Sequence, residues 1–294
     1  MTDIGRHGRR RRVGPIWLAT CPVAAGAVAV ALFIATQSAA AEVAPVGLGT
    51  TASYAVLAGT TVTNTGLSVI HGNLGVSPGT AVTGFPPGIV VGGTIHAADA
   101  NAAGAQSDLT TAYNDAAGRT PTFPVITSGF IGAGQTLAPG VYKAPSSLDV
   151  GGALILDGED NPNAVFIFQA GSTLGTDTGT TISLINGAQA CNVFWQVGSS
   201  ATLNTSTTFQ GTILALTSIS VLHGDVIFGR TLASNGAVTL DDDTITRPHC
   251  TTTPPPTPTP TMTTPSPTPT QTSPTPTPTP TPTQTSPTPT PTQT

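Results

Sequence analysis

The sequence predicts an all-β protein with a single helix, organised as a β-solenoid with that helix lying alongside. Short apolar–polar–apolar segments recur between Gly, Asn, Asp and Thr turns, and three of them follow one another at intervals of 18 and 19 residues. One long stretch instead has apolar residues at helical spacing. Charged residues make up only 8% of the chain, so Thr, Ser, Asn and the backbone must provide most of the polar surface that water contacts.

The first 41 residues have the pattern of a secretion signal peptide. Five arginines within residues 6–12 precede an apolar run at 23–35, and small residues at 38–41 then form an A-x-A-like cleavage site. An uncleaved membrane anchor is the alternative, because apolar residues begin as early as Val13; Pro22 and the small residues favour cleavage. We therefore expect a secreted, extracellular protein, with cell-surface association as a variant.

Residues 251–294 form a tail that contains only Thr, Pro, Ser, Gln and one Met, with 16 prolines among them. Alternating proline fixes φ and removes backbone donors, so neither a helix nor a sheet can form. Without hydrophobic residues the tail cannot build a core either. We expect a disordered, extended spacer whose hydroxyls offer O-glycosylation sites and whose position allows association with a cell wall.

The remaining residues, 42–250, are numerous enough to bury a core as one domain. Within them, residues 95–118 are predicted to be the helix, which Gly118 and the nearby Pro121 end. Its apolar stripe follows steps of three and four residues and is mostly alanine: Ala98, Ala102, Ala105, Leu109, Ala112 and Ala116. Such a stripe predicts close packing against a flat neighbour.

The repeated segments predict three short strands per solenoid turn. Each places a polar residue between two inward-pointing ones, so the central residues face outward. The segments are Leu148-Asp149-Val150, Ser172-Thr173-Leu174, Ala201-Thr202-Leu203, Ile219-Ser220-Val221 and Val238-Thr239-Leu240. Because coils stack at about 4.8 Å, the central residues are expected to form a ladder on one flat face.

Two cysteines, Cys191 and Cys250, remain after removal of the signal peptide. An even pair in an exported chain is expected to form a disulfide. A thiol nucleophile or a thiolate metal ligand is the alternative, and oxidation would abolish either one.

The composition argues against several functions. The body has four basic residues against thirteen acidic ones, so nucleic acid is not an expected partner. It contains no GxSxG, P-loop, GxGxxG or HExxH motif, and its histidines are scattered. The acidic runs 157–163 and 241–243 lack calcium-loop spacing and are interpreted as solvated turns. We expect no enzyme, cofactor, metal or small-molecule substrate.

Threonines provide the remaining signal. Between residues 60 and 65 the chain alternates so that Thr61, Thr63 and Thr65 share one face. For any single Thr, high β-propensity is a sufficient explanation. That explanation is weaker where Thr, Ser and Ala residues are aligned in rows on a flat face that carries no Lys or Glu.

Several segments resemble the DUF3494 ice-binding protein family, and the similarity covers nearly all of residues 46–250. They are YAVLAG at 54–59, GNLGVSPG at 72–79, TGFPPG at 83–88, AYNDAAG at 112–118, LAPGVY at 137–142, NAVFIFQ at 163–169 and NVFWQVG at 192–198. The resemblance implies a discontinuous right-handed β-helix of triangular section flanked by one α-helix. It also implies adsorption to an ice crystal surface, with inhibition of ice growth and recrystallisation.

The resemblance places the ice-binding face on the ladder. Its members would be Thr63 and Asn64, then Ser147 or Asp149, and then Thr173, Thr202, Ser220 and Thr239. A T-A/G-x-T/N pattern found in some family members occurs at Thr80–Thr83 and Thr178–Thr181, and at 111–114 within the predicted helix. Asp149 departs from the pattern, because a charge disturbs a weakly hydrated plane.

Two other functions remain open. The body could be an adhesion or structural module of the cell envelope, with the Thr-Pro tail as its stalk. It could also be a polysaccharide-binding β-helix, although aromatic residues are only 5% of the chain and are predicted to lie in the core. We expect the protein to act as a monomer.

Overall fold

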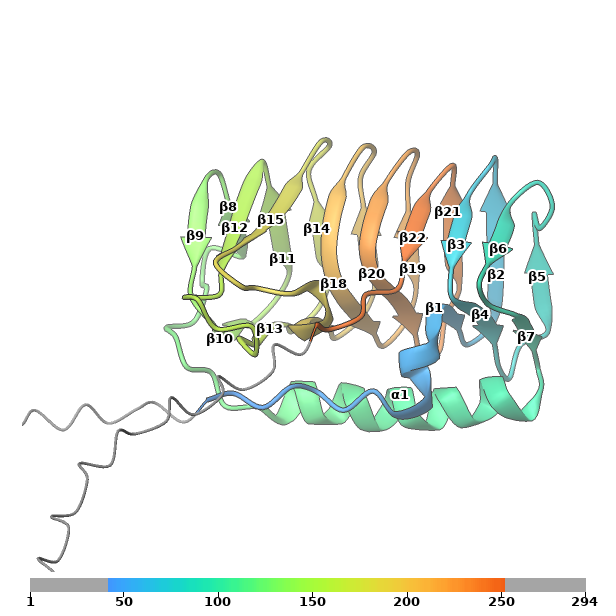
Figure 1. Ribbon diagram of the computed structural model, residues 1–294, viewed down its shortest axis with the longest axis horizontal. Coiled ribbons are helices and arrows are strands. Elements are labelled where there is room, and N and C mark those ends of the chain that lie inside the picture. Colours follow the sequence, from blue (N-terminus) through green and yellow to red (C-terminus); the bar gives the residue numbers. More distant parts are fainter. Residues whose placement is uncertain (1–41, 252–294) are drawn as a thin grey trace, which may run out of the picture. The chain divides into compact units, whose positions relative to one another are not determined.

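A computed structural model describes residues 42–251 (Figure 1). The predicted signal peptide and nearly all of the Thr-Pro tail lie outside the described residues. Within the described range most of the regular secondary structure is strand, with one long helix and two short 3-10 turns, Gly49–Ser53 and Ala190–Asn192. No helix in this range combines the length and apolar character that a bilayer crossing requires.

The described strands pair only in parallel and form one 14-stranded and one eight-stranded sheet. We call the outward surface of the eight-stranded sheet the ladder face. Its strands, in spatial order, are β8 (Phe130–Gly132), β11 (Leu148–Gly151), β14 (Leu174–Thr176), β17 (Ala201–Leu203), β19 (Ile219–Val221), β21 (Val238–Asp241), β2 (Thr61–Thr65) and β5 (Ala81–Thr83).

The 14-stranded sheet divides into two runs that share β18 (Thr208–Ala215) and β20 (Val226–Ala233). One run, here called the Val/Thr face, consists of β9 (Gln135–Leu137), β12 (Ala153–Asp157), β15 (Thr181–Ile185), the first halves of β18 and β20, β22 (Thr244–Thr246), β3 (Val69–His71) and β6 (Ile89–Val91). The other consists of β10 (Gly140–Ala144), β13 (Phe166–Ala170), β16 (Val193–Val197), the second halves of β18 and β20, β1 (Tyr54–Ala58), β4 (Asn73–Val76) and β7 (Ile95–Ala97).

The stack is discontinuous in sequence. Strands β1, β2 and β3 pair with β20, β21 and β22, so the N-terminal coils stack directly on the C-terminal ones. One coil combines β21 and β22 with β1, and the blue and orange strands meet there in Figure 1. The predicted β-solenoid with one helix is therefore confirmed.

The helix α1 (Ala100–Gly118) lies along the stack (Figure 1) and buries the predicted stripe except Ala98, which precedes the helix and is exposed. Its predicted start near Ile95 is wrong, because residues 95–97 pair with β4 as β7. Asp99 caps the helix by accepting a 2.8 Å hydrogen bond from Ala102 N. At the other end, Gln169 Nε2 donates to Ala116 O and Arg119 O, so a buried strand residue satisfies the terminal carbonyls.

Large aromatic side chains stack inside the solenoid. Phe168 and Trp195 lie directly opposite each other on β13 and β16, with their ring centroids 4.0 Å apart. Tyr142 and Phe209 extend this stack on either side. The Trp195 indole is also satisfied, since its Nε1–H donates to Gln210 O at 2.9 Å. The aromatic residues of the stack therefore act as core.

Cys191 and Cys250 form the expected disulfide, with their Cα atoms 5.5 Å apart. The bridge ties the segment after β22 to the short turn at Ala190–Asn192, next to a 2.7 Å hydrogen bond from Thr251 N to Gln189 Oε1. It therefore holds the C-terminal segment across several coils.

Replacing both Cys191 and Cys250 with Ser is expected to lower the free energy of unfolding by roughly 4 kcal/mol, the chain-entropy value for a loop of this length. Equilibrium unfolding in guanidinium chloride measures the change, with reduction of the parent protein as an independent route to the same state. An unchanged unfolding midpoint would show that the hydrogen bonds around Gln189 alone hold the segment.

Candidate functional site

The ladder face carries an outward file of residues in strict register. Parallel pairing aligns Thr202 with Ser220, Ser220 with Thr239, and Thr239 with Thr63. Thr63 is in turn aligned with Thr83 on β5. We call these five residues the hydroxyl file; at about 4.8 Å per strand it is roughly 19 Å long.

The side chains of the hydroxyl file face solvent because their neighbours in each strand face the core. Val62, Ala201, Leu203, Ile219, Val221, Val238 and Leu240 are all buried. The four threonines of the file are exposed and Ser220 is half-buried between them. None of the five hydroxyls forms a hydrogen bond within the described part of the chain. Each is therefore free to bind water, next to the γ-methyl of a threonine.

A second row of small residues borders the hydroxyl file. Thr61 is aligned with Ala81. On the neighbouring coils, Ser218 Oγ accepts a 3.2 Å hydrogen bond from Ala237 N, while Ser200 Oγ accepts one from Ser218 N at 3.3 Å. Through these hydrogen bonds the hydroxyls link neighbouring coils, which makes the plane rigid as well as flat.

Beyond Thr202 the file loses its hydroxyls. Thr202 is aligned with Gly175, Gly175 with Asp149, and Asp149 with Phe130. Of the two alternatives, Asp149 is therefore the file residue, while Ser147 precedes β11. The charge of Asp149 separates the hydroxyl file from the β8 end of the sheet.

Two ladder assignments from the sequence are wrong. Thr173 is exposed but precedes β14, whose outward residue is Gly175; the residue after it, Thr176, points inward and is buried. It can do so because its buried hydroxyl lies 3.0 Å from Thr207 Oγ1 and accepts from Asn204 N at 2.8 Å. The residue of this strand that lies in the file is therefore two positions after the predicted one.

Asn64 is the second wrong assignment, because it points inward and is only 6% exposed. Its Nδ2 donates to Gly66 O at 3.0 Å and Gly84 O at 2.9 Å, so it holds the turns that follow β2 and β5. Thr65, two residues from Thr63, faces outward beside Asp241 at the edge of the sheet.

The two T-x-x-T motifs lie on different faces. Thr83 belongs to the hydroxyl file and Thr80 precedes its strand. Thr181 instead lies on β15, in the Val/Thr face, and Thr178 is in the turn before it. Spacing within one segment cannot tell these cases apart, because the face of a strand depends on its place in the coil.

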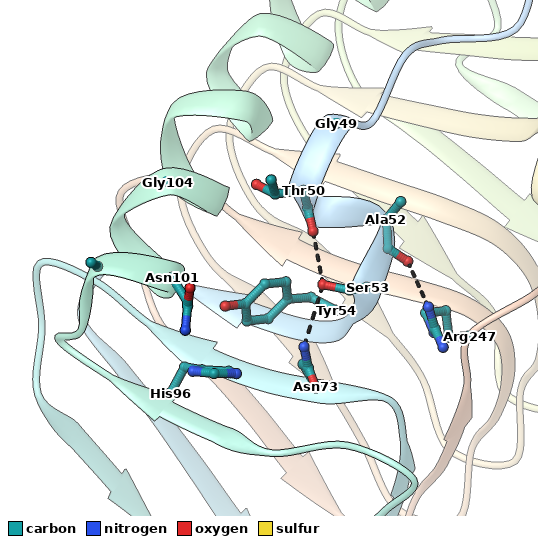
Figure 2. A pocket seen from close by; sticks show the side chains of 11 residues that line it. Gly49, Thr50, Ala52, Ser53, Tyr54, Asn73, His96, Asn101, Gly104 and Arg247 are labelled. Carbon is teal, nitrogen blue, oxygen red and sulfur yellow. Dashed lines mark hydrogen bonds between the residues drawn. The ribbon is translucent and has the colours of Figure 1, made fainter.

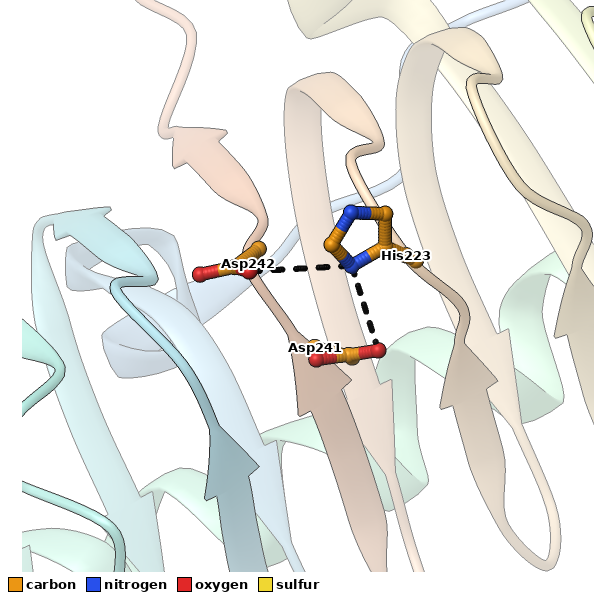
Figure 3. A group of neighbouring side chains, drawn as sticks. All are labelled: His223, Asp241 and Asp242. Carbon is orange, nitrogen blue, oxygen red and sulfur yellow. Dashed lines mark ion pairs between the residues drawn. The ribbon is translucent and has the colours of Figure 1, made fainter.

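At one edge of the ladder face, His223 lies beside Asp241 and Asp242 (Figure 3). His223 Nδ1 is 3.3 Å from Asp241 Oδ2 and 3.6 Å from Asp242 Oδ2. These three residues are the one group of three potential metal ligands within residues 42–251; His223 and Asp242 are exposed, and Asp241 is half-buried. Sequence reasoning treated His223 and the acidic run separately, and stacking of β19 on β21 brings them together.

The acidic run is not wholly solvated, which corrects the sequence interpretation. Asp243 is buried, and its carboxylate accepts hydrogen bonds from Asp225 N at 2.9 Å and Asp241 N at 2.8 Å. Asp225, buried one coil further, accepts from Thr207 N at 2.7 Å. Burial, together with repulsion from the neighbouring carboxylate, raises the pKa of Asp225 to about 7; burial also raises the pKa of Asp243 to about 7.

These raised pKa values predict that stability falls with rising pH. Between the ordinary carboxyl pKa of 3.8 and about 7, the folded protein holds protons that the unfolded chain has released. Thermal unfolding should therefore give a higher melting temperature at pH 5 than at pH 8. Asp225→Asn, which replaces a carboxylate oxygen that has no partner, should raise the melting temperature at pH 8.

The control for this effect is Asp177→Asn at an exposed carboxylate. It should leave the difference between pH 5 and pH 8 unchanged. A melting temperature that does not depend on pH in the parent protein would contradict the assignment of this dependence to Asp225 and Asp243.

An open cavity of about 660 Å³ lies beside the first turn of α1 (Figure 2). Within it His96 Nδ1 is 2.7 Å from Asp99 Oδ2, an arrangement that orients a histidine. The nearby Ser53 hydroxyl donates to Thr50 O at 2.9 Å and accepts from Asn73 Nδ2 at 3.3 Å. These contacts do not pair Ser53 with His96 as nucleophile and base.

Comparisons with known proteins agree with this architecture. Residues 56–246 match the family described as Ice-binding-like. An ice-binding protein of Nostoc sp. (strain HG1) is 48% identical over 228 residues, which cover 77% of this chain and 83% of that protein. An ice-binding protein of Flavobacterium frigoris (strain PS1) is 36% identical over 215 residues, covering 69% and 76%.

Solved structures give the same result. The crystal structure of an ice binding protein from an Antarctic biological consortium superimposes with a TM-score of 0.66 at 46% identity, covering 70% of this chain and 93% of that one. An ice-binding protein from Antarctomyces psychrotrophicus also gives 0.66, at 39% identity and with 69% and 98% coverage. With a family match across most of the solenoid and relatives above 30% identity, this chain belongs to the Ice-binding-like family.

Proposed function

We propose that this protein is a secreted, non-enzymatic ice-binding protein that adsorbs to ice through the ladder face. The observation that supports this most directly is the hydroxyl file: five exposed or half-exposed Thr and Ser residues in register on a flat, uncharged part of a sheet. The names of its relatives point to the same ligand.

The proposed mechanism is adsorption without turnover. Hydroxyl and methyl groups on a regular plane order the adjacent water into an ice-like layer, which merges with the crystal. Ice must then grow with a curved front between bound molecules, and curvature lowers the local freezing point. Rigidity contributes to affinity because few conformations are lost on binding. The file of Thr residues over buried Val, Ile and Leu supplies that rigid plane.

We further infer the finer features of this function. The three strand runs are taken to wind as a right-handed coil of triangular section. Residues 1–41 direct export, and the Thr-Pro tail acts as a spacer whose hydroxyls are sites for O-glycosylation. The body is taken to work as a monomer, since one ladder face suffices for adsorption.

The test is an ice-recrystallisation assay on the purified protein, alongside thermal hysteresis measured with a nanolitre osmometer. We expect recrystallisation to be inhibited and a faceted crystal to form within the hysteresis gap. If ice grows as it does with an equal amount of serum albumin, ice binding is wrong for this chain. The cell-envelope adhesion alternative, in which the tail is a stalk, would then be favoured.

A further inference from the structure

The three side chains at the edge of the ladder face are spaced too widely for a close histidine–carboxylate ion pair (Figure 3). His223 Nδ1 lies 3.3 Å from Asp241 Oδ2 and 3.6 Å from Asp242 Oδ2. Hydrogen bonds between charged groups are shorter, at about 2.7–2.9 Å. Such a bond does form elsewhere in this protein, where His96 Nδ1 is 2.7 Å from Asp99 Oδ2. His223 instead lies between two carboxylates without a close hydrogen bond to either.

These distances match the spacing of ligand atoms around a zinc ion. Histidine nitrogen and carboxylate oxygen bind zinc at about 2.0–2.2 Å, usually in a tetrahedral arrangement. Two ligand atoms at such distances and at the tetrahedral angle lie about 3.3–3.6 Å apart. The imidazole nitrogen and one oxygen of each carboxylate all lie within 4.8 Å of one another. Three protein ligands leave a fourth position that a water molecule can fill.

The two turns that carry this cluster are rich in negative charge. Residues 222–225 lead from β19 to β20 and include His223 and Asp225, while residues 241–243 lead from β21 to β22 and are all aspartate. Neither turn contains Lys or Arg. Asp225 is fully buried, and its Oδ2 has no hydrogen-bond partner within residues 42–251. Four carboxylates in two adjacent turns therefore attract a cation.

Hydrogen bonds between coils fix the backbone around the cluster. Gly224 N donates to Asp241 O at 3.0 Å, which holds the β19–β20 turn against the end of β21. Asp242 N donates to Thr65 O at 3.0 Å, which holds the next turn against the end of β2. The two turns that supply the ligands are thus held in register with each other and with an N-terminal coil.

The carboxylate of Asp242 is oriented by a contact of its own. Its Oδ1 accepts a hydrogen bond from Leu67 N. Glycine at position 66 makes room for this contact, because a Cβ there would collide with Asp242 Oδ1. The second oxygen, Oδ2, is the one on the side of His223. A supporting hydrogen bond to a ligating carboxylate is typical of metal sites, where it fixes the ligand before the ion arrives.

We propose that His223, Asp241 and Asp242 bind one divalent transition-metal ion of the zinc type. The ion clamps the β19–β20 turn to the β21–β22 turn, next to the junction at which N-terminal coils stack on C-terminal ones. A histidine ligand favours zinc over calcium, which takes oxygen ligands. The site acts independently of ice adsorption, because none of its three side chains belongs to the hydroxyl file.

The test is isothermal titration calorimetry of ZnCl2 into the purified protein, which carries no affinity tag and has been freed of metal with EDTA. CaCl2 is titrated in parallel. His223→Ala and Asp242→Asn each remove one ligand. His249→Ala and Asp177→Asn are the matched controls, because each changes an exposed residue of the same type away from the cluster. Circular dichroism confirms that every variant is folded.

We expect the parent protein to bind one zinc ion per chain. Each ligand variant should weaken zinc binding at least about tenfold, since even the loss of a group that supports a metal ligand costs about 10–100-fold in affinity. Both controls should match the parent, and calcium should bind at least about tenfold more weakly than zinc. A parent that binds no zinc would overturn the proposal. So would unchanged binding in His223→Ala, or calcium binding as tight as that of zinc.

The melting temperature tests the clamp separately. Zinc should raise the melting temperature of the parent and of His249→Ala, because an ion that binds only the folded protein stabilises it. It should not raise that of His223→Ala. An equal rise in His223→Ala, or zinc binding without any rise in the parent, would contradict the clamp. Neither measurement involves ice, so these results are independent of whether the ladder face adsorbs to it.

Discussion

Replacing Thr239 with Tyr is expected to abolish most recrystallisation inhibition while leaving the melting temperature unchanged. Thr239 lies in the middle of the hydroxyl file, paired with Ser220 on one side and Thr63 on the other. A phenol ring there projects beyond the plane and holds the neighbouring hydroxyls away from the crystal. Folding loses little, because the side chain already points into solvent and substitutions at such sites usually change stability by less than about 0.5 kcal/mol.

The dilution endpoint of the recrystallisation assay measures this loss, and Thr111→Tyr is its control. Thr111 is exposed on α1, on the side away from the sheet, so the same ring is added without touching the ladder face. Equal loss in both variants would mean that the ladder face is not the principal contact. Full activity of Thr239→Tyr would lead to the same conclusion.

Replacing Trp195 with Ala is expected to be the most destabilising single substitution considered for the core. The side chain is 1% exposed and stacks between Phe168 and Phe209, and its indole N–H is hydrogen-bonded to Gln210 O. Removal leaves a cavity between coils and costs about 3–5 kcal/mol. The melting temperature should fall by roughly 10 °C for a domain of this size.

Differential scanning calorimetry measures this change, with Phe228→Ala as the control. Phe228 is an aromatic residue two coils away but is 45% exposed, so its removal should cost much less. A similar loss in both variants would show that the aromatic stack does not carry the stability assigned to it.

Much of the architecture follows from local sequence. The triplets at 201–203, 219–221 and 238–240 lie at constant spacing, and each alternates inward and outward side chains, so their stacking and outward faces could be predicted. The alanine stripe of α1 could also be predicted, because helical periodicity extends over five turns. The start of α1 could not be predicted, because Ile95–Ala97 continue the helical pattern but form a strand that pairs with β4.

The site was predictable only in part, for the same reason. Thr202, Ser220, Thr239 and Thr63 follow from strand alternation. Thr173 is exposed, but the β14 residue that pairing aligns with Thr202 is Gly175. Asn64 is buried, and its Nδ2 donates to Gly66 O and Gly84 O. Strand alternation places Asn64 inward, between Thr63 and Thr65, and it cannot tell which of two outward residues continues a file from coil to coil.

The sequence by itself determined the repeat, the single helix, the Cys191–Cys250 pair and the identity of the hydroxyl residues, since each depends on spacing or composition within a short stretch. Only the tertiary structure decided that Thr83 extends the file that runs from Thr202 to Thr63, because the N-terminal coils stack on the C-terminal ones. The tertiary structure also decided that Thr181 belongs to another face. Register across strands distant in the sequence is set by which coils pack together, and no local pattern encodes that choice.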